Sequence, residues 1–159
     1  MQFYRVAESD EGKFDTLNGL KDAINSHITI IYVSNSLKAD WLFDKMANMG
    51  CNVARVHEDM PSKLCGKTML EFRSGAFRVV VVSLAYSVDV VQVSLVIHFD
   101  LPCSGDRYVR SISRAGRFGG TGVAINLVTV DDLPALKELQ MFCRVPIEDM
   151  PANVADFIS

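Results

Sequence analysis

Residues 78–83 read R-V-V-V-V-S, and this stretch decides the fold class. Val79 to Val82 are β-branched residues, which favour extended backbone. An uninterrupted apolar run of this length predicts a strand that is buried on both faces. Such strands belong mainly to parallel sheets that helices cover on both sides.

Similar short apolar runs recur along the chain and are separated by stretches with helical spacing. Strands are predicted at 29–33, 52–57, 78–83, 94–99 and 122–129, with a further edge strand at 3–7. Helices are predicted at 13–24, 37–49, 62–72 and 133–143. This alternation predicts an α/β fold in three layers, with a mostly parallel sheet and helices on both faces, as one domain over 1–159.

In sheets of this kind, ligands bind beyond the carboxyl ends of the strands. We therefore expect functional residues in the segments that follow Val33, His57, Ser83 and Phe99. The glycine-rich stretch before Val123 is expected to join them.

The composition is that of an ordinary globular domain. Hydrophobic residues make up 49% of the chain and charged residues 22%, and the net charge is −3. No apolar run reaches the ~18 residues that a membrane-spanning helix needs, and residues 1–14 are too polar and acidic for a signal peptide. We expect a cytoplasmic or nuclear protein without a membrane partner, whose RNA or DNA contacts, if any, are local because the domain is not basic.

Two weaker signals favour structural interpretations. The cysteines, Cys51, Cys65, Cys103 and Cys143, form no C-x-x-C pair, so we expect reduced thiols and no metal site. The stretch 66–68, G-K-T, is half of a phosphate-binding loop, but Pro61 stands where that loop needs its first glycine. A helix with a poorly placed glycine is the favoured interpretation.

Residues 106–122 carry the strongest chemical signal and read D-R-Y-V-R-S-I-S-R-A-G-R-F-G-G-T-G. Arg107, Arg110, Arg114 and Arg117 fall within this stretch, and the first three share one face if it is helical. Guanidinium groups match the oxygens of phosphate. From the residues alone, a solvated basic face is an equally good explanation.

This stretch resembles motif VI of the DEAD-box RNA helicases, H-R-I-G-R-x-G-R-F-G. Other parts of the chain are similar to the second RecA-like domain of that family, in its initiation factor 4A branch. They are K-F-D-T-L at 13–17, K-A-D-W-L at 38–42, H-E-D-M-P at 57–61, F-R-S-G at 72–75, F-D-L-P at 99–102, G-V-A-I-N at 122–126 and M-P-A-N-V-A-D at 150–156. The resemblance covers the whole chain and implies a RecA-like fold.

The resemblance also implies roles for particular residues. Arg114 and Arg117 match the two arginine fingers, which act on the γ-phosphate of ATP, and Asp89 matches the acid that contacts the nucleotide. The RNA-contacting positions are Asn35, Arg73, Gly75 and Ser83. ATP and Mg²⁺ are expected to be held mainly by an N-terminal RecA-like domain, which this sequence does not include. The isolated chain is therefore expected to be inactive, and a HEAT-repeat scaffold of the initiation factor 4G type is an expected partner.

Departures from the family pattern concentrate on the RNA-facing motifs. Leu37 and Cys65 stand where the family has arginine, and Glu58 replaces a glycine. Motif V is two residues short, and Tyr86 with Ser87 replaces its Arg-Gly pair. We expect weakened RNA binding, because phosphate contacts dominate non-specific affinity. The alternative is a degenerate helicase domain that acts as a non-catalytic protein-interaction module.

Overall fold

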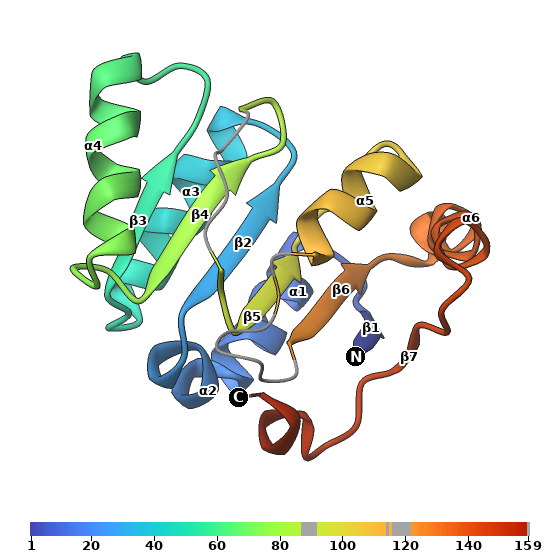
Figure 1. The fold of residues 1–159 in the computed structure, drawn as a ribbon. Coiled ribbons are helices and arrows are strands. Elements are labelled where there is room, and N and C mark those ends of the chain that lie inside the picture. The colour runs from blue at the N-terminus through green and yellow to red at the C-terminus, as the bar shows by residue number, and fades with distance from the viewer. Residues whose placement is uncertain (87–91, 114, 116–121, 159) are drawn as a thin grey trace.

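A computed structural model describes residues 1–86, 92–113, 115 and 122–158. Within these residues, one sheet of seven strands has the order β3-β4-β2-β5-β6-β1-β7 (Figure 1). The strands are β1 Gln2–Val6, β2 Thr29–Val33, β3 Val53–Val56, β4 Val79–Ser83, β5 Leu95–His98, β6 Val123–Val128 and β7 Glu148–Asp149. Every ladder between them is parallel, so the carboxyl ends of the strands share one edge.

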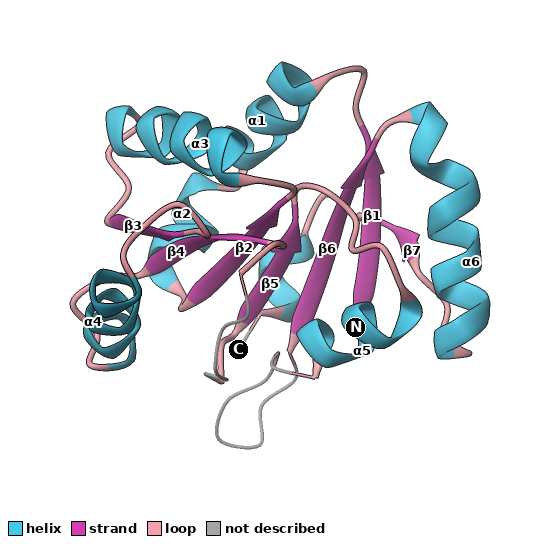
Figure 2. Ribbon diagram, turned by 90° about the horizontal axis from the view of Figure 1, so that it is seen from above, coloured by secondary structure: helices cyan, strands magenta, loops and turns pink. Residues whose placement is uncertain are grey.

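Helices cover both faces of this sheet. They are α1 Asp10–Gly19, α2 Lys21–Ser26, α3 Ser36–Asn48, α4 Ser62–Arg73, α5 Gly105–Ile112 and α6 Leu133–Cys143, with short 3₁₀ turns η1 Val130–Asp132 and η2 Val154–Phe157. Figure 2 shows α1 and α3 on one face and α4 and α5 on the other, with α6 beside the β1 end of the sheet. The predicted three-layer arrangement is confirmed.

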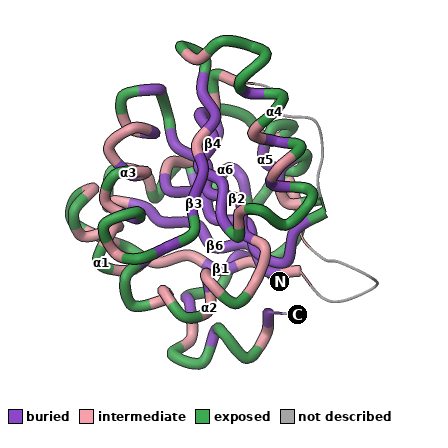
Figure 3. The backbone as a smooth tube through the Cα atoms, turned by 90° about the vertical axis from the view of Figure 1, so that its left-hand side faces the viewer, coloured by how far each residue is buried: buried purple, intermediate pink, exposed green. Residues whose placement is uncertain are grey.

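The four valines of β4 show why helices pack on both faces of the sheet. Val79 and Val81 pack in the core under α1, α2 and α3, whereas Val80 and Val82 pack against α4. All four side chains are completely buried, and the strands form the buried centre of the molecule in Figure 3. Alternate side chains of a strand point to opposite faces, so a strand with helices on both sides is apolar at every position.

Two predicted elements differ from the structure. The helix predicted at 13–24 is two helices, α1 and α2, because the chain turns at Leu20. Gly19 precedes this turn, and glycine destabilises the interior of a helix. The strand predicted at the edge, β1, pairs with β6 on one side and with β7 on the other. A two-residue strand such as β7 leaves no periodic signal in the sequence.

The stretch that resembles a phosphate loop lies inside α4. Residues Gly66, Lys67 and Thr68 are helical, and Pro61 begins the helix. Their backbone N–H groups therefore serve the helix and do not form a cradle for phosphate, which confirms the structural interpretation. None of the helices in the described ranges combines the length and apolar character that a bilayer span requires.

Candidate functional site

The segments that follow β2, β3 and β4 meet at the carboxyl edge of the sheet. Val33 and Ser83 are in register at the ends of β2 and β4, and the backbone N–H of Leu84 donates to the carbonyl oxygen of Val33 at 2.7 Å. The arrowheads of the three strands point to the same side of the molecule in Figure 1. This edge brings together two of the residues predicted to contact RNA, Asn35 and Ser83.

Asn35 begins α3 at this edge. Its side-chain oxygen accepts a hydrogen bond from the backbone N–H of Lys38 at 2.9 Å, which is the usual N-cap contact. The residue itself is exposed. The next residue, Ser36, donates its hydroxyl to a carboxylate oxygen of Asp59, in the turn between β3 and α4.

Ser83 ends β4 and is fully buried. Its hydroxyl donates to a carboxylate oxygen of Glu58 at 3.3 Å and accepts the backbone N–H of Ala85 at 3.2 Å. Glu58 is exposed, so its carboxylate lies between Ser83 and solvent. The sequence identified Glu58 as a departure from the family pattern but did not show that it contacts Ser83.

His57 holds the turn that presents Glu58 and Asp59. Its Nε2 lies 3.0 Å from a carboxylate oxygen of Asp40, and its Nδ1 accepts the backbone N–H of Asp59 at 3.1 Å. Asp40 also pairs with Arg55 at 3.1 Å. His57 therefore has a structural role, and the turn is anchored to both α3 and β3.

A buried lysine stabilises the neighbouring end of β5. The ammonium group of Lys13, on α1, donates to the carbonyl oxygen of Phe99 at 2.7 Å and lies 3.5 Å from Asp100 and 3.9 Å from Asp132. Only 3% of its side chain is exposed. The sequence analysis missed this role, although Lys13 lies four residues before the buried Leu17 and so shares its helix face.

Asp100 joins this lysine to the start of α3. Its carboxylate accepts the backbone N–H of Ser34 at 2.8 Å and pairs with Lys38 at 3.0 Å. Burial alone would lower the pKa of Lys38, but hydrogen bonds and charge from Asp100 and Asp10 raise it above its usual value. Lys38 therefore stays charged, and its charge is already engaged by carboxylates.

The other two residues predicted to contact RNA lie at the opposite edge. Arg73 ends α4, and Gly75, with a φ of 90°, leads into the amino end of β4. The length of β4 separates them from Ser83, roughly 13 Å at about 3.3 Å per residue. The structure does not bring Arg73 and Gly75 together with Asn35 and Ser83.

Helix α5 precedes the arginine-rich stretch. Ser104 caps it, and the guanidinium of the exposed Arg107 donates to the carbonyl oxygen of Leu84 at 3.0 Å, which places a positive charge at the carboxyl edge.

Arg114, Arg117 and Asp89 lie outside the described residues. Ala115 forms a parallel bridge with Val93, ahead of β5, and Gly122 immediately precedes β6. The glycine-rich stretch at 116–121, which was expected to join the carboxyl edge, also lies outside the described residues.

A buried polar network holds α5 on the sheet. His98 Nδ1 lies 2.9 Å from Asn126 Oδ1, and His98 Nε2 lies 2.7 Å from the Ser111 hydroxyl. Asn126 Nδ2 also donates to the hydroxyl oxygen of Tyr108 at 3.0 Å, and that hydroxyl donates to Gln2. A neutral imidazole with its proton on Nδ1 satisfies the Asn126 contact, and the Ser111 hydroxyl has both His98 Nε2 and the carbonyl oxygen of Tyr108, at 2.8 Å, within reach. Burial lowers the pKa of His98 from 6.5 to about 4, although the Asn126 hydrogen bond opposes the shift.

Acid should destabilise the domain through His98. Its pKa is lower in the folded chain than in the unfolded chain, so the unfolded chain binds more protons between the two values. Stability should fall as the pH drops from about 6.5 towards 4, by roughly 2 kcal/mol between pH 7 and 5. Urea unfolding of the wild type and His98→Gln at both pH values measures this, because the variant should lack that part of the slope. Equal slopes in both proteins would contradict the prediction.

The parallel sheet, its strand order and its two helical layers define an α/β domain of the RecA-like class. Residues 12–119 match the helicase conserved C-terminal domain, and the chain belongs to this family. Among solved structures, the C-terminal domain of the DEAD-box protein Dbp5 superposes with a TM-score of 0.85 at 28% identity, covering 98% of this chain and 92% of that one. The Escherichia coli DEAD-box protein SrmB, bound to regulator of ribonuclease activity A, gives a TM-score of 0.85 at 26% identity, with coverages of 97% and 92%.

Sequence relatives indicate the branch of the family. The ATP-dependent RNA helicases eIF4A of Aspergillus clavatus and Pyricularia oryzae are each 43% identical over 159 residues, or 99% of this chain. The chain spans 40% of the length of these relatives. Saccharomyces cerevisiae Dbp5 bound to RNA and ADP BeF3 has a TM-score of 0.82 at 27% identity, over 93% of this chain and 40% of Dbp5.

Proposed function

We propose that this chain is the second RecA-like domain of an ATP-dependent RNA helicase of the initiation factor 4A type. The chain is a helicase C-terminal domain that is 43% identical to eIF4A. The proposal depends on the further observation that Asn35 and Ser83 lie at the same edge of its sheet. In this role the domain contributes part of an RNA surface, and Arg114 and Arg117 supply positive charge to the phosphoryl group being transferred. A cytoplasmic or nuclear location accords with this role.

ATP is the substrate in this proposal, and another domain holds most of it together with Mg²⁺. The described residues do not fit the nucleotide by themselves, because G-K-T at 66–68 is helical. Nor do those residues include a group of three or more His, Cys, Asp or Glu side chains placed to hold a metal ion. We propose that an N-terminal RecA-like domain supplies both functions, that Asp89 contacts the nucleotide, and that the 159-residue chain alone does not hydrolyse ATP.

The isolated chain should bind single-stranded RNA weakly. Leu37 and Cys65 offer no charge where the family has arginine, and Glu58 adds a negative charge. Each lost phosphate contact removes part of the salt-dependent affinity. Fluorescence anisotropy should give a dissociation constant above about 1 μM, equivalent to a binding free energy weaker than about −8 kcal/mol. Tighter binding would contradict the proposed loss of RNA contacts.

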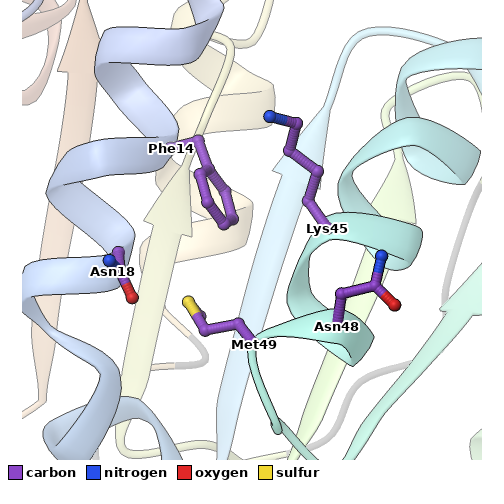
Figure 4. Close-up of a pocket in the computed structure, with 5 residues that line it drawn as sticks. All are labelled: Phe14, Asn18, Lys45, Asn48 and Met49. Carbon is purple, nitrogen blue, oxygen red and sulfur yellow. The ribbon is translucent and has the colours of Figure 1, made fainter.

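A second candidate function is protein interaction without catalysis. An open groove of about 430 Å³ lies between α1 and α3 and is lined by Phe14, Asn18, Lys45, Asn48 and Met49. Figure 4 shows Phe14 and Asn18 on α1, and Lys45, Asn48 and Met49 on α3 or directly after it. The Lys45 ammonium lies 5.0 Å from the centre of the Phe14 ring, and Glu11 pairs with it at 2.7 Å.

We propose that the expected scaffold protein binds in this groove. Its aromatic, thioether and amide groups suit a protein surface, because interfaces combine apolar anchors with polar partners. A HEAT-repeat scaffold of the initiation factor 4G type is the proposed partner. The groove is compatible with both candidate functions, so RNA-stimulated ATP hydrolysis by a protein that joins this domain to an N-terminal RecA-like domain distinguishes the helicase from the non-catalytic module.

A further inference from the structure

Two serine hydroxyls at the carboxyl edge are engaged by acidic side chains of the same turn. Ser83, at the end of β4, donates to Glu58 at 3.3 Å, and Ser36, at the start of α3, donates to Asp59. Both acids lie in the turn between β3 and α4, and both are exposed. These two buried hydroxyl groups are therefore directed at the protein's own carboxylates.

A carboxylate in this position opposes phosphate in two ways. A hydroxyl has one proton to donate, so a hydroxyl that donates to a carboxylate cannot donate it to a phosphate oxygen. The carboxylate also repels the phosphate, and two like unit charges about 4 Å apart in water weaken an association by about fivefold. An anionic ligand at Ser83 must therefore displace Glu58 or bind beside it.

Glu58 is the residue that sets this chain apart. The stretch H-E-D-M-P at 57–61 resembles the family pattern H-G-D-M-P, which has aspartate at the position of Asp59. The backbone N–H of Asp59 donates to His57. Glu58 stands where that pattern has glycine, which has no side chain to reach Ser83. The contact between Glu58 and Ser83 is therefore a property of this sequence.

We propose that Glu58 limits the affinity of this domain for RNA by occupying Ser83 and repelling the phosphate that Ser83 would bind. The inference rests on the proposed function, because it assumes that RNA approaches the carboxyl edge. The ligand class is the phosphate backbone of single-stranded RNA. Glu58 thus acts as an internal competitor, and its effect is electrostatic and sensitive to salt.

The experiment compares RNA binding of the 159-residue chain and Glu58→Gln by fluorescence anisotropy with a labelled single-stranded RNA. Glutamine keeps the size of the side chain and removes its charge. The variant should bind about fivefold more tightly, the factor expected for one like-charge pair in water. This gain should shrink as salt is added, because salt screens exposed charges.

A second variant tests the hydroxyl itself. Glu58→Ala also removes the acceptor oxygen that glutamine keeps, so it should bind more tightly than Glu58→Gln, and adding Ser83→Ala to Glu58→Ala should remove this additional gain. Glu138→Gln on α6 is the matched control, since it makes the same change at an exposed position on another element. Circular dichroism of each variant confirms that the domain is folded.

The possible outcomes separate this inference from the proposed function. Weak RNA binding by the wild type with no gain in Glu58→Gln, or an equal gain in Glu138→Gln, would overturn the role of Glu58 and leave the proposed function standing. An additional gain in Glu58→Ala that survives Ser83→Ala would also overturn it, because Ser83 would not be the blocked donor. An absence of RNA binding by every variant up to about 1 mM, or about −4 kcal/mol, would overturn the proposed RNA surface and this inference with it.

Discussion

Replacing either Arg114 or Arg117 with alanine should abolish most RNA-stimulated ATP hydrolysis in a protein that joins this domain to an N-terminal RecA-like domain. Arginine fingers contribute roughly 10³–10⁵-fold to the rate in related phosphoryl-transfer enzymes, because they stabilise charge that develops in the transition state. The affinity for ATP should change much less, since the proposed N-terminal domain is expected to hold most of the nucleotide. Steady-state ATPase kinetics with saturating RNA measure both quantities.

Two further variants make this test specific. Lysine at either position should not restore full activity, because it offers a point charge in place of a planar fork. Arg110→Ala removes an exposed guanidinium from α5, at a position where the family has histidine, and should have a smaller effect. Full activity in both finger variants, with circular dichroism showing a folded domain, would exclude the proposed finger role, whereas a joined wild-type protein without RNA-stimulated ATPase activity would exclude the helicase proposal and favour the interaction module.

Replacing Lys13 with methionine should destabilise the domain by about 3 kcal/mol, the lower end of the range for breaking a buried ion pair. The change keeps an apolar stem of similar length but removes the ammonium group that donates to the carbonyl oxygen of Phe99. It also leaves Asp100 with Lys38 as its remaining charged partner among the contacts described here. Buried acceptors without their donor account for the loss. Urea unfolding followed by circular dichroism measures the free energy of unfolding.

Lys137→Met is the matched control for this prediction. Lys137 is exposed on α6, so the same substitution there should change the free energy of unfolding by less than about 0.5 kcal/mol. A similarly small change in the free energy of unfolding at Lys13 would contradict the prediction, because it would show that the ion pairs of Lys13 are no stronger than its interactions with water. The comparison also separates loss of the ammonium group from any general effect of adding methionine.

Much of the architecture could be predicted from local patterns. The strand at β4 and the helix at α6 were placed correctly because a valine run and a regular apolar spacing are strong signals. The helix predicted at 37–49 is α3, and its Trp41 packs against the core with its ring centre 5.9 Å from that of Phe99. The two-residue strand β7 could not be predicted, because its existence depends on a tail that returns to pair with β1.

The candidate site was only partly predictable. Motif resemblance indicated Asn35 and Ser83, and the structure places them together, but it places Arg73 and Gly75 at the far edge of the sheet. Resemblance to family motifs identifies candidate residues, but it does not show at which edge of the sheet each residue lies. The roles of Arg114, Arg117 and Asp89 stay predictions, because these residues lie outside the described part of the chain.

By itself, the sequence determined the fold class and the family. Both depend on features that are local in the chain: the periodicity of apolar residues and short motifs at set spacings. The tertiary structure alone decided which polar groups meet. Ser83 and Glu58 are 25 residues apart, and Lys13 and Phe99 are 86 apart, yet each pair shares a hydrogen bond. Such contacts arise because parallel strands bring distant segments to a common edge, and no pattern within a single segment records them.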